Sequence, residues 1–159
     1  MAEITLTLNK SQVSARQGMT ILDLAQENGI DIPTLCYLEG LPPMGACRLC
    51  VVEVEGSRTL VASCHTPITQ GMVINTHSPK VLETRKVVLE LLLANHCGSC
   101  LLCEKANVCE IRKIAADVEL GIPRFEVRKR YYQIEDISPY IKRDMSKCIL
   151  CRRCVVACN

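Results

Sequence analysis

The residues of this chain with the strongest chemical character are its cysteines, which make up 12 of the 159 residues. Cysteine at this level is typical of chains that build disulfides or metal sites. The recurring step between neighbouring cysteines is Cys-x-x-Cys, a spacing suited to metal or redox chemistry. The cysteines form three groups: Cys36, Cys47, Cys50 and Cys64; then Cys97, Cys100, Cys103 and Cys109, preceded by His96; then Cys148, Cys151, Cys154 and Cys158.

The even cysteine count is compatible with six disulfides, but three features oppose that interpretation. The N-terminus has the pattern of an amphipathic strand and not that of a signal peptide. The chain is longer than the small secreted scaffolds that depend on disulfides. The two-residue gaps also favour metal ligands over a disulfide framework. The sequence therefore predicts free thiolate ligands and a reducing, cytoplasmic location.

The first group has the spacing C-x10-C-x2-C-x13-C. Four thiolates, of which three lie in a loop containing glycine and proline, suit a [2Fe–2S] cluster. A four-cysteine zinc site is the alternative, but such sites prefer two Cys-x-x-Cys pairs. Only Cys47 and Cys50 form such a pair here. The spacing therefore favours an iron–sulfur cluster.

The second group is compatible with two ligand sets for a [4Fe–4S] cluster. Cys97, Cys100, Cys103 and Cys109 form an all-cysteine set with regular spacing at its start. His96 in place of Cys97 forms a mixed set. Spacing alone leaves both sets open.

The third group, C-x2-C-x2-C-x3-C, is the run found in bacterial ferredoxins, whose fourth cysteine ligates the other cluster in two-cluster proteins. On this pattern Cys148, Cys151 and Cys154 hold one [4Fe–4S] cluster and Cys158 serves a further one. Neither cluster then has a full ligand set within the sequence, so we expect the polypeptide to continue past Asn159. A zinc site that uses all four cysteines is the alternative.

The elements between the groups predict an α+β chain. Alternating apolar residues indicate strands, and apolar residues at helical spacing indicate helices. Thr20 with Asp23 resembles a capping box, and Ser78-Pro79 is typical of a helix start. A hairpin, a helix and a cysteine-bearing loop, in that order, predict a β-grasp ferredoxin-like domain. The predicted strands are 3–9, 12–15, 51–55, 58–62 and 71–75, and the predicted helices are 21–28, 79–95 and 108–120.

Composition excludes several classes of function. Aromatic residues are only 3% of the chain and Trp is absent, so there is no base-stacking platform for nucleic acid. The longest apolar stretch, 87–94, contains Glu90 and is too short to span a membrane. The sequence has no nucleotide-binding fingerprint, no Ser-His-Asp set and no paired carboxylates, so no catalytic site is predicted within these 159 residues.

The ordered combination of these motifs resembles the N-terminal electron-transfer region shared by several oxidoreductases. They are the large cluster-bearing subunit of complex I, the [FeFe] hydrogenases, the diaphorase small subunit of NAD-reducing hydrogenases and the NAD-dependent formate dehydrogenases. The resemblance implies one [2Fe–2S] cluster on the first group and one or two further [4Fe–4S] clusters at the third. It implies His96, Cys100, Cys103 and Cys109 as ligands of a histidine-ligated [4Fe–4S] cluster, with Cys97 outside the ligand set.

The resemblance also implies a division of the chain and a set of partners. Residues 1–78 are expected to form the [2Fe–2S] domain, 79–123 the histidine-ligated [4Fe–4S] domain, and 124–159 a connector with the start of a ferredoxin domain. The expected partners are a flavin- and NADH-binding subunit and a hydrogenase, formate dehydrogenase or quinone-linked subunit. Two alternatives stay open, namely the N-terminal part of a larger catalytic subunit and a zinc-stabilised interaction module.

Overall fold

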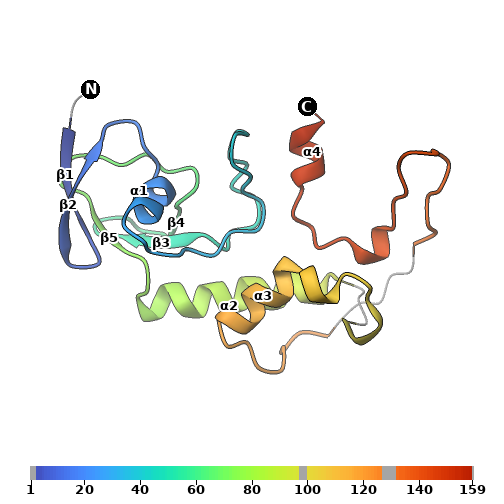
Figure 1. Cartoon of the computed structure of the whole chain (residues 1–159). Helices are drawn as coiled ribbons and strands as arrows, with labels where there is room; N and C mark the ends of the chain where they lie inside the picture. The colour runs from blue at the N-terminus through green and yellow to red at the C-terminus, as the bar shows by residue number, and fades with distance from the viewer. Residues whose placement is uncertain (1–2, 97–99, 127–131, 159) are drawn as a thin grey trace. The chain divides into compact units, whose positions relative to one another are not determined.

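The computed structural model describes residues 3–96, 100–126 and 132–158. The chain divides into two compact units, one made of Met1–Arg85 with Arg152–Asn159 and the other of Lys86–Cys151. The first unit contains strands and helices together, in agreement with the predicted α+β class (Figure 1). Its strands are β1 (Glu3–Leu8), β2 (Ser11–Arg16), β3 (Val51–Val54), β4 (Val61–Ala62) and β5 (Val73–Asn75), and its first helix is α1 (Ile21–Glu27).

The five strands form one mixed sheet in the order β2-β1-β5-β3-β4. β1 pairs with β2 as an antiparallel hairpin, and β5 lies between β1 and β3. β5 is parallel to β1 and antiparallel to β3. The two residues of the hairpin turn, Asn9 and Lys10, have φ values of 49° and 73°. Positive φ at both central residues matches the turn type whose twist suits a two-residue hairpin.

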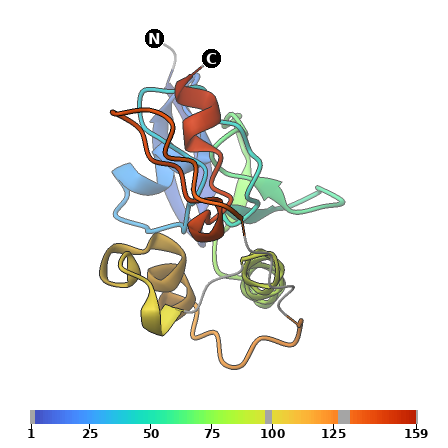
Figure 2. The same ribbon diagram turned by 90° about the vertical axis from the view of Figure 1, so that its right-hand side faces the viewer.

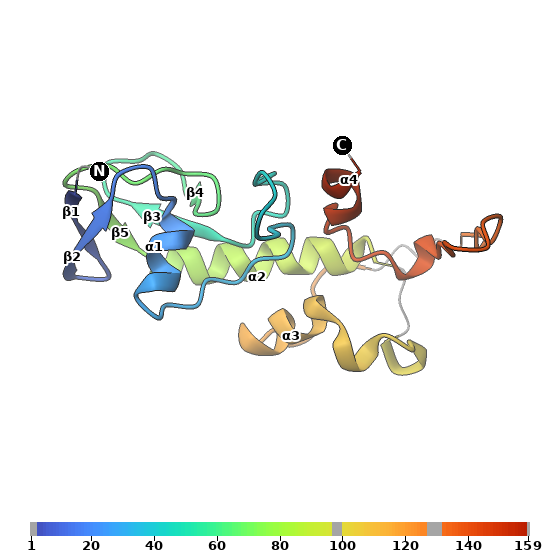
Figure 3. The same cartoon turned by 45° about the horizontal axis from the view of Figure 1, so that its top comes forward.

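The core of the first unit lies between the sheet and α1 (Figure 3). Alternation along β1 directs Ile4, Leu6 and Leu8 inward, as the sequence predicts, and each is at most 8% exposed. Successive side chains of a strand point to opposite faces, so one period-two pattern buries a complete row. The apolar face of α1 covers that row with Ile21, Leu22, Leu24 and Ala25.

The capping box predicted at the start of α1 is present. The Thr20 hydroxyl accepts a hydrogen bond from the Asp23 N–H at 3.2 Å, and the Asp23 carboxylate accepts one from the Thr20 N–H at 2.9 Å. The helix ends at Asn28, and Gly29 follows with a φ of 68°. Both ends are therefore fixed by local residue chemistry.

Thr20→Ala should lower the stability of the first unit by about 1 kcal/mol, the usual effect of losing an N-cap side chain. The reason is that the N–H of Asp23 loses its acceptor. Urea unfolding followed by far-UV circular dichroism gives the change in midpoint. Thr69→Ala, at an exposed position, is the matched control and should leave the midpoint in place. Equal midpoints for Thr20→Ala and the unsubstituted chain would contradict this role of the cap.

Two predicted elements are shorter in the structure. The expected strand 58–62 is reduced to β4, because the Ser57 hydroxyl donates to the Thr59 carbonyl at 2.8 Å and holds that segment in a local turn. The expected helix 108–120 is reduced to α3 (Glu110–Asp117). Its first turn is preceded by the 3₁₀ helix η2 (Ala106–Val108), and Glu119 beyond it has a φ of 51°, which no helix accommodates.

Helix α2 (Pro79–Ala94) begins in the first unit and continues into the second. Its N-terminus matches the prediction, since Ser78 Oγ accepts from the Val81 N–H at 3.4 Å. The second unit also contains α3 and the 3₁₀ helices η1 (Cys100–Leu102), η2 and η3 (Met145–Lys147), and the last helix, α4 (Arg153–Ala157), leads to the C-terminus (Figure 2). Within the described ranges, no helix is long and apolar enough to cross a membrane.

Candidate functional site

The β3–β4 pair brings two cysteines of the first group together. Val51 and Ala62 are partners in the antiparallel ladder, and the Ser63 N–H donates to the Cys50 carbonyl at 3.0 Å. Cys50 and Cys64 stand at the end of this ladder, and their sulfur atoms are 3.5 Å apart. Residues that are 14 positions apart in sequence thus become neighbours through one short hairpin.

The start of α1 holds the Cys64 segment in place. The N–H groups of a first helical turn have no partner within their own helix. Here the Ile21 N–H donates to the Thr66 carbonyl at 3.0 Å, and the Leu22 N–H donates to the Ser63 carbonyl at 3.1 Å. The predicted helix therefore satisfies its free donors with the segment that carries the last cysteine of the first group.

All four thiols of the first group are buried. Cys36 and Cys47 are each 5% exposed, and Cys50 and Cys64 are each 1% exposed. The hydrogen bond with Cys64 lowers the pKa of Cys50 to about 6. The pKa of Cys64 is raised by that same hydrogen bond, by burial and by the charges of Cys50, Cys36 and Cys47. The four sulfur atoms thus lie close enough to repel one another when ionised, and bound metal cations remove such a repulsion.

The turn between Cys47 and Cys50 is shaped for an anionic sulfur. Arg48 has a φ of 59°, a left-handed conformation that few residues other than glycine adopt. Alternating right- and left-handed residues direct successive N–H groups to one side, an arrangement found at many iron–sulfur sites. Burial raises the pKa of the Cys47 thiol, and hydrogen bonds from the Leu49 and Cys36 N–H groups act in the opposite direction.

Ser63 belongs to this site, although sequence reasoning did not single it out. Its side chain is fully buried, and its hydroxyl has no hydrogen-bond partner of ordinary geometry within the described chain. It nevertheless lies close enough to the Cys50 sulfur to lower the pKa of that thiol. An otherwise unpaired donor beside a thiolate can give that thiolate the hydrogen bond that metal ligands ordinarily receive from their surroundings. The only sequence signal was its position directly before Cys64.

The second group lies on a compact coil in the second unit. Cys100 opens η1, Cys103 directly follows it, and Cys109 is the N-cap residue of α3. Backbone hydrogen bonds stabilise this coil. The Cys103 N–H donates to the Cys100 carbonyl at 3.4 Å, and the Ala106 N–H donates to the Cys103 carbonyl at 3.0 Å. As the N-cap residue, Cys109 stands at the N-terminal end of α3, which is the positive end of the helix dipole. Cys100 is exposed, and Cys103 and Cys109 are half-buried.

His96 is buried, in contrast to the capping or solvent-facing position that a histidine beside a helix end more often takes. It is 8% exposed, and its Nδ1 lies 3.0 Å from the carbonyl oxygen of Cys148. A carbonyl oxygen only accepts, so Nδ1 carries the proton and donates. Nε2 is then the nitrogen with a free lone pair. A metal-binding histidine characteristically donates its other ring N–H in this way.

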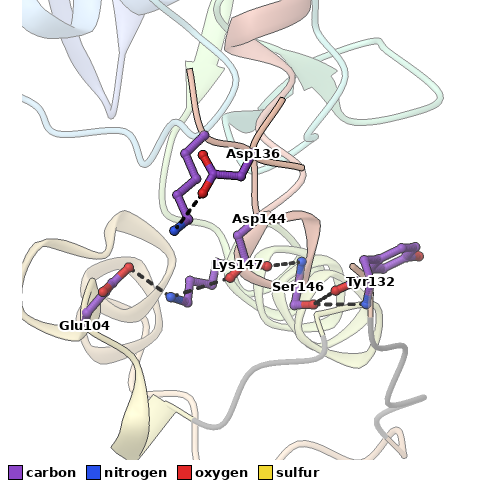
Figure 4. Close-up of polar contacts among 7 residues, drawn as sticks. Glu104, Tyr132, Asp136, Asp144, Ser146 and Lys147 are labelled. Atoms are coloured by element: carbon purple, nitrogen blue, oxygen red, sulfur yellow. Dashed lines mark hydrogen bonds and ion pairs between the residues drawn. The ribbon is translucent and has the colours of Figure 1, made fainter. Parts of the chain in front are cut away.

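The first part of the third group lies beside this coil within the second unit. Lys147, which precedes Cys148, forms ion pairs with Glu104 at 2.9 Å and Asp144 at 3.5 Å (Figure 4). Glu104 directly follows Cys103. The pKa of Glu104 is accordingly lowered by its hydrogen bond with Lys147. Together with the His96 contact, this ion pair joins the chain near Cys103 to the chain near Cys148.

The Cys148 turn shares one feature with the Cys47 turn, a backbone N–H that acts on the cysteine sulfur. The Leu150 N–H donates to the Cys148 sulfur at 3.4 Å, as the Leu49 N–H does to Cys47, again two residues after the cysteine. Leu150 and Arg152 have φ values of 60° and 58°, so both Cys-x-x-Cys steps of the third group contain a left-handed residue. Cys154 lies on α4, and Cys158 caps this helix with its N–H donating to the Cys154 carbonyl at 3.2 Å.

The structure brings some predicted ligands together within a single unit. The first group is assembled, and His96 is placed next to Cys148. Cys97 lies outside the described residues. Cys148 and Cys151 belong to the second unit, whereas Cys154 and Cys158 belong to the first. Every cysteine that the structure describes has a free thiol. In the described part of the chain, no three His, Cys, Asp or Glu side chains converge on a single-ion site.

Two family models match the chain. A model described as a 2Fe-2S iron-sulfur cluster binding domain matches residues 1–79. A model described as the NADH-ubiquinone oxidoreductase-G iron-sulfur binding region matches residues 85–124. Together they cover the first and second cysteine groups.

Relatives and a solved structure extend the similarity along the whole chain. The NADP-reducing hydrogenase subunit HndD of Solidesulfovibrio fructosivorans is 45% identical over 164 residues, which cover 100% of this chain and 28% of that protein. The 78 kDa subunit of the mitochondrial NADH-ubiquinone oxidoreductase of Candida albicans (strain SC5314 / ATCC MYA-2876) is 36% identical, covering 98% of this chain and 22% of that protein. A crystal structure of an NAD⁺-reducing [NiFe]-hydrogenase matches with a TM-score of 0.89 and 32% identity, covering 98% of this chain and 66% of that one.

The chain spans less than a third of the length of these two curated relatives. The cysteine groups, the five-stranded sheet and the two family models agree with one another. The chain belongs to the family that shares this iron–sulfur electron-transfer region, with relatives in the NADH-quinone oxidoreductases and in the NAD(P)-reducing hydrogenases.

Proposed function

We propose that this chain relays electrons between an NAD(P)H- and flavin-binding subunit and a hydrogenase, formate dehydrogenase or quinone-linked partner. The observation that carries the proposal is the assembly of four buried thiols in the first unit, with Cys50 and Cys64 sulfur atoms 3.5 Å apart. Iron–sulfur clusters supply one-electron transfer when bound, at potentials set by ligands, hydrogen bonds and burial. The protein's own part is to hold these groups, exclude water and position donors around the sulfur atoms.

Cys36, Cys47, Cys50 and Cys64 are proposed as the ligands of a [2Fe–2S] cluster in the domain formed by residues 1–78. Three features of the structure support the fit. The thiols are buried, the backbone N–H groups of Leu49 and Cys36 lower the pKa of Cys47, and the Ser63 hydroxyl is an unpaired donor beside Cys50. Cluster ligands are spread over several iron atoms, so they need not converge on one point as zinc ligands do.

His96, Cys100, Cys103 and Cys109 are proposed as the ligands of a [4Fe–4S] cluster in the domain formed by residues 79–123. The burial of His96 and its Nδ1 contact with Cys148 support Nε2 as the ligand atom. The chemistry of the donor set fits, since an imidazole and three thiolates are all ligands that cluster iron accepts. Cys97 is proposed to take no part.

Cys148, Cys151 and Cys154 are proposed as ligands of a further [4Fe–4S] cluster, and Cys158 as a ligand of another, within residues 124–159. The support is local: left-handed residues in both Cys-x-x-Cys steps and an N–H directed at the Cys148 sulfur. A second candidate function, the N-terminal part of a larger catalytic subunit, is favoured by the 28% share of HndD that the chain spans.

Metal analysis tests the proposal directly. Protein purified without oxygen should be brown and should contain iron and acid-labile sulfide, because sulfide belongs to iron–sulfur clusters and not to zinc sites. Zinc should be well below one equivalent per chain. A colourless protein with stoichiometric zinc and negligible sulfide would instead identify a zinc-stabilised interaction module.

A further inference from the structure

Arg85, on α2, is the one cation among the largest fully buried side chains of the described chain, at 2% exposure. Arginine is almost never this buried unless it is paired. Its Nη2 donates to the carbonyl oxygen of Val51 at 2.8 Å. Val51 directly follows Cys50, so this hydrogen bond holds the guanidinium next to the first cysteine group.

Within the described residues, no carboxylate lies at ion-pair distance from the Arg85 guanidinium. No ion pair involves Arg85 within the described ranges, and its Nε–H has no acceptor there. Burial lowers the pKa of Arg85 to about 10, and the negative charges of Cys50 and Asp31 oppose that shift. Arg85 therefore remains a cation at neutral pH. An isolated buried charge costs several kcal/mol, so an anion is required near it.

Two negative charges act on Arg85, and that of Cys50, in the first cysteine group, has a larger effect than that of Asp31. Four thiolates and two sulfides outweigh two ferric ions, so an oxidised [2Fe–2S] site is already anionic, and reduction adds one more negative charge. We propose that Arg85 is the buried counter-cation of this site and that it raises the reduction potential of the cluster bound there. The inference rests on the proposed function, which supplies the cluster.

The direction of the effect follows from electrostatics. A fixed positive charge stabilises the more negative, reduced form more than the oxidised form. The interaction is strong because it operates through protein interior and not through water. Without the Arg85 charge, the same ligands should hold a cluster that is harder to reduce.

The test compares three variants of the full chain, prepared without oxygen. Arg85→Gln removes the positive charge, and Arg85→Lys keeps a positive charge on a different side chain. Lys80→Gln is the matched control, since it removes one positive charge from an exposed position of the same helix. The potential of the [2Fe–2S] cluster is measured by redox titration with electron paramagnetic resonance, and the [4Fe–4S] signals of the same sample are an internal reference.

We expect Arg85→Gln to lower the equilibrium constant for cluster reduction at least tenfold, which is about 59 mV for one electron. Arg85→Lys should retain most of the original potential, and Lys80→Gln all of it. An unchanged potential in a fully loaded Arg85→Gln variant overturns the proposal.

If Arg85→Gln loses the cluster, the Arg85→Lys variant shows whether the charge or the packing of Arg85 is responsible. A recovered cluster supports the role of the charge, and a cluster missing from both variants assigns Arg85 to packing and overturns the proposal. Failure of the proposed function is a separate result, because the unsubstituted chain would then lack iron and sulfide altogether.

Discussion

Cys64→Ser should abolish the [2Fe–2S] signal of the reduced chain and leave the [4Fe–4S] signals in place. Cys64 is 1% exposed and its sulfur lies 3.5 Å from that of Cys50, so its thiolate is a buried member of the proposed ligand set. A serine hydroxyl is a far weaker ligand for cluster iron than a thiolate, which is the usual ligand. Loss of the cluster should also lower the urea midpoint of the chain, because metal binding free energy contributes to folding free energy.

His65→Ser is the control for this experiment. It introduces the same residue one position away, at an exposed site, and should keep the full signal and the original iron content. A Cys64→Ser protein with an unchanged [2Fe–2S] signal would remove Cys64 from the ligand set. Iron and sulfide determinations on the same samples separate loss of the cluster from a change in its spin state.

His96→Ala should remove the middle [4Fe–4S] cluster, whereas Cys97→Ser should leave its spectrum and potential unchanged. His96 is buried, and its Nδ1 proton is engaged by the Cys148 carbonyl, so Nε2 is the nitrogen available to iron. His96→Cys should keep the cluster and lower its potential by about 100 mV or more, because replacing a neutral imidazole by a thiolate adds negative charge to the site, the reverse of the effect in Rieske centres.

Redox titration followed by electron paramagnetic resonance measures both the presence and the potential of this cluster. His77→Ala, which removes an exposed histidine, is the control and should change neither. Loss of the cluster in Cys97→Ser together with its retention in His96→Ala would reverse the assignment and support the all-cysteine ligand set.

Local chemistry made much of the first unit predictable from sequence. The Thr20–Asp23 box, the Asn9-Lys10 turn and the alternation in β1 each depend on residues a few positions apart, and the structure contains all three. Element ends were less predictable. The hydroxyl of Ser57 and the left-handed Glu119 shorten a strand and a helix without any change in hydrophobic pattern.

The polar contacts around the proposed sites were not predictable in the same way. Arg85 occurs in a helix of mixed charge, where arginines ordinarily face solvent, and its acceptor lies 34 residues earlier. His96 and Cys148 are 52 residues apart. Such pairings depend on tertiary packing, and a single sequence contains no periodic signal for them. The cysteine spacing predicted candidate ligands but not the groups that surround them.

The position of β5 has a consequence for how the protein is made. This strand supplies the link between β1 and β3, and its partners in β1, Thr7 and Leu8, are synthesised 66 residues before Val73 and Ile74. Contacts of such long range form slowly. On the ribosome, the two hairpins of the sheet therefore lack a common neighbour until β5 has emerged. We expect the thiols of the first group to be accessible to a cluster donor during that interval, and insertion of β5 to end it.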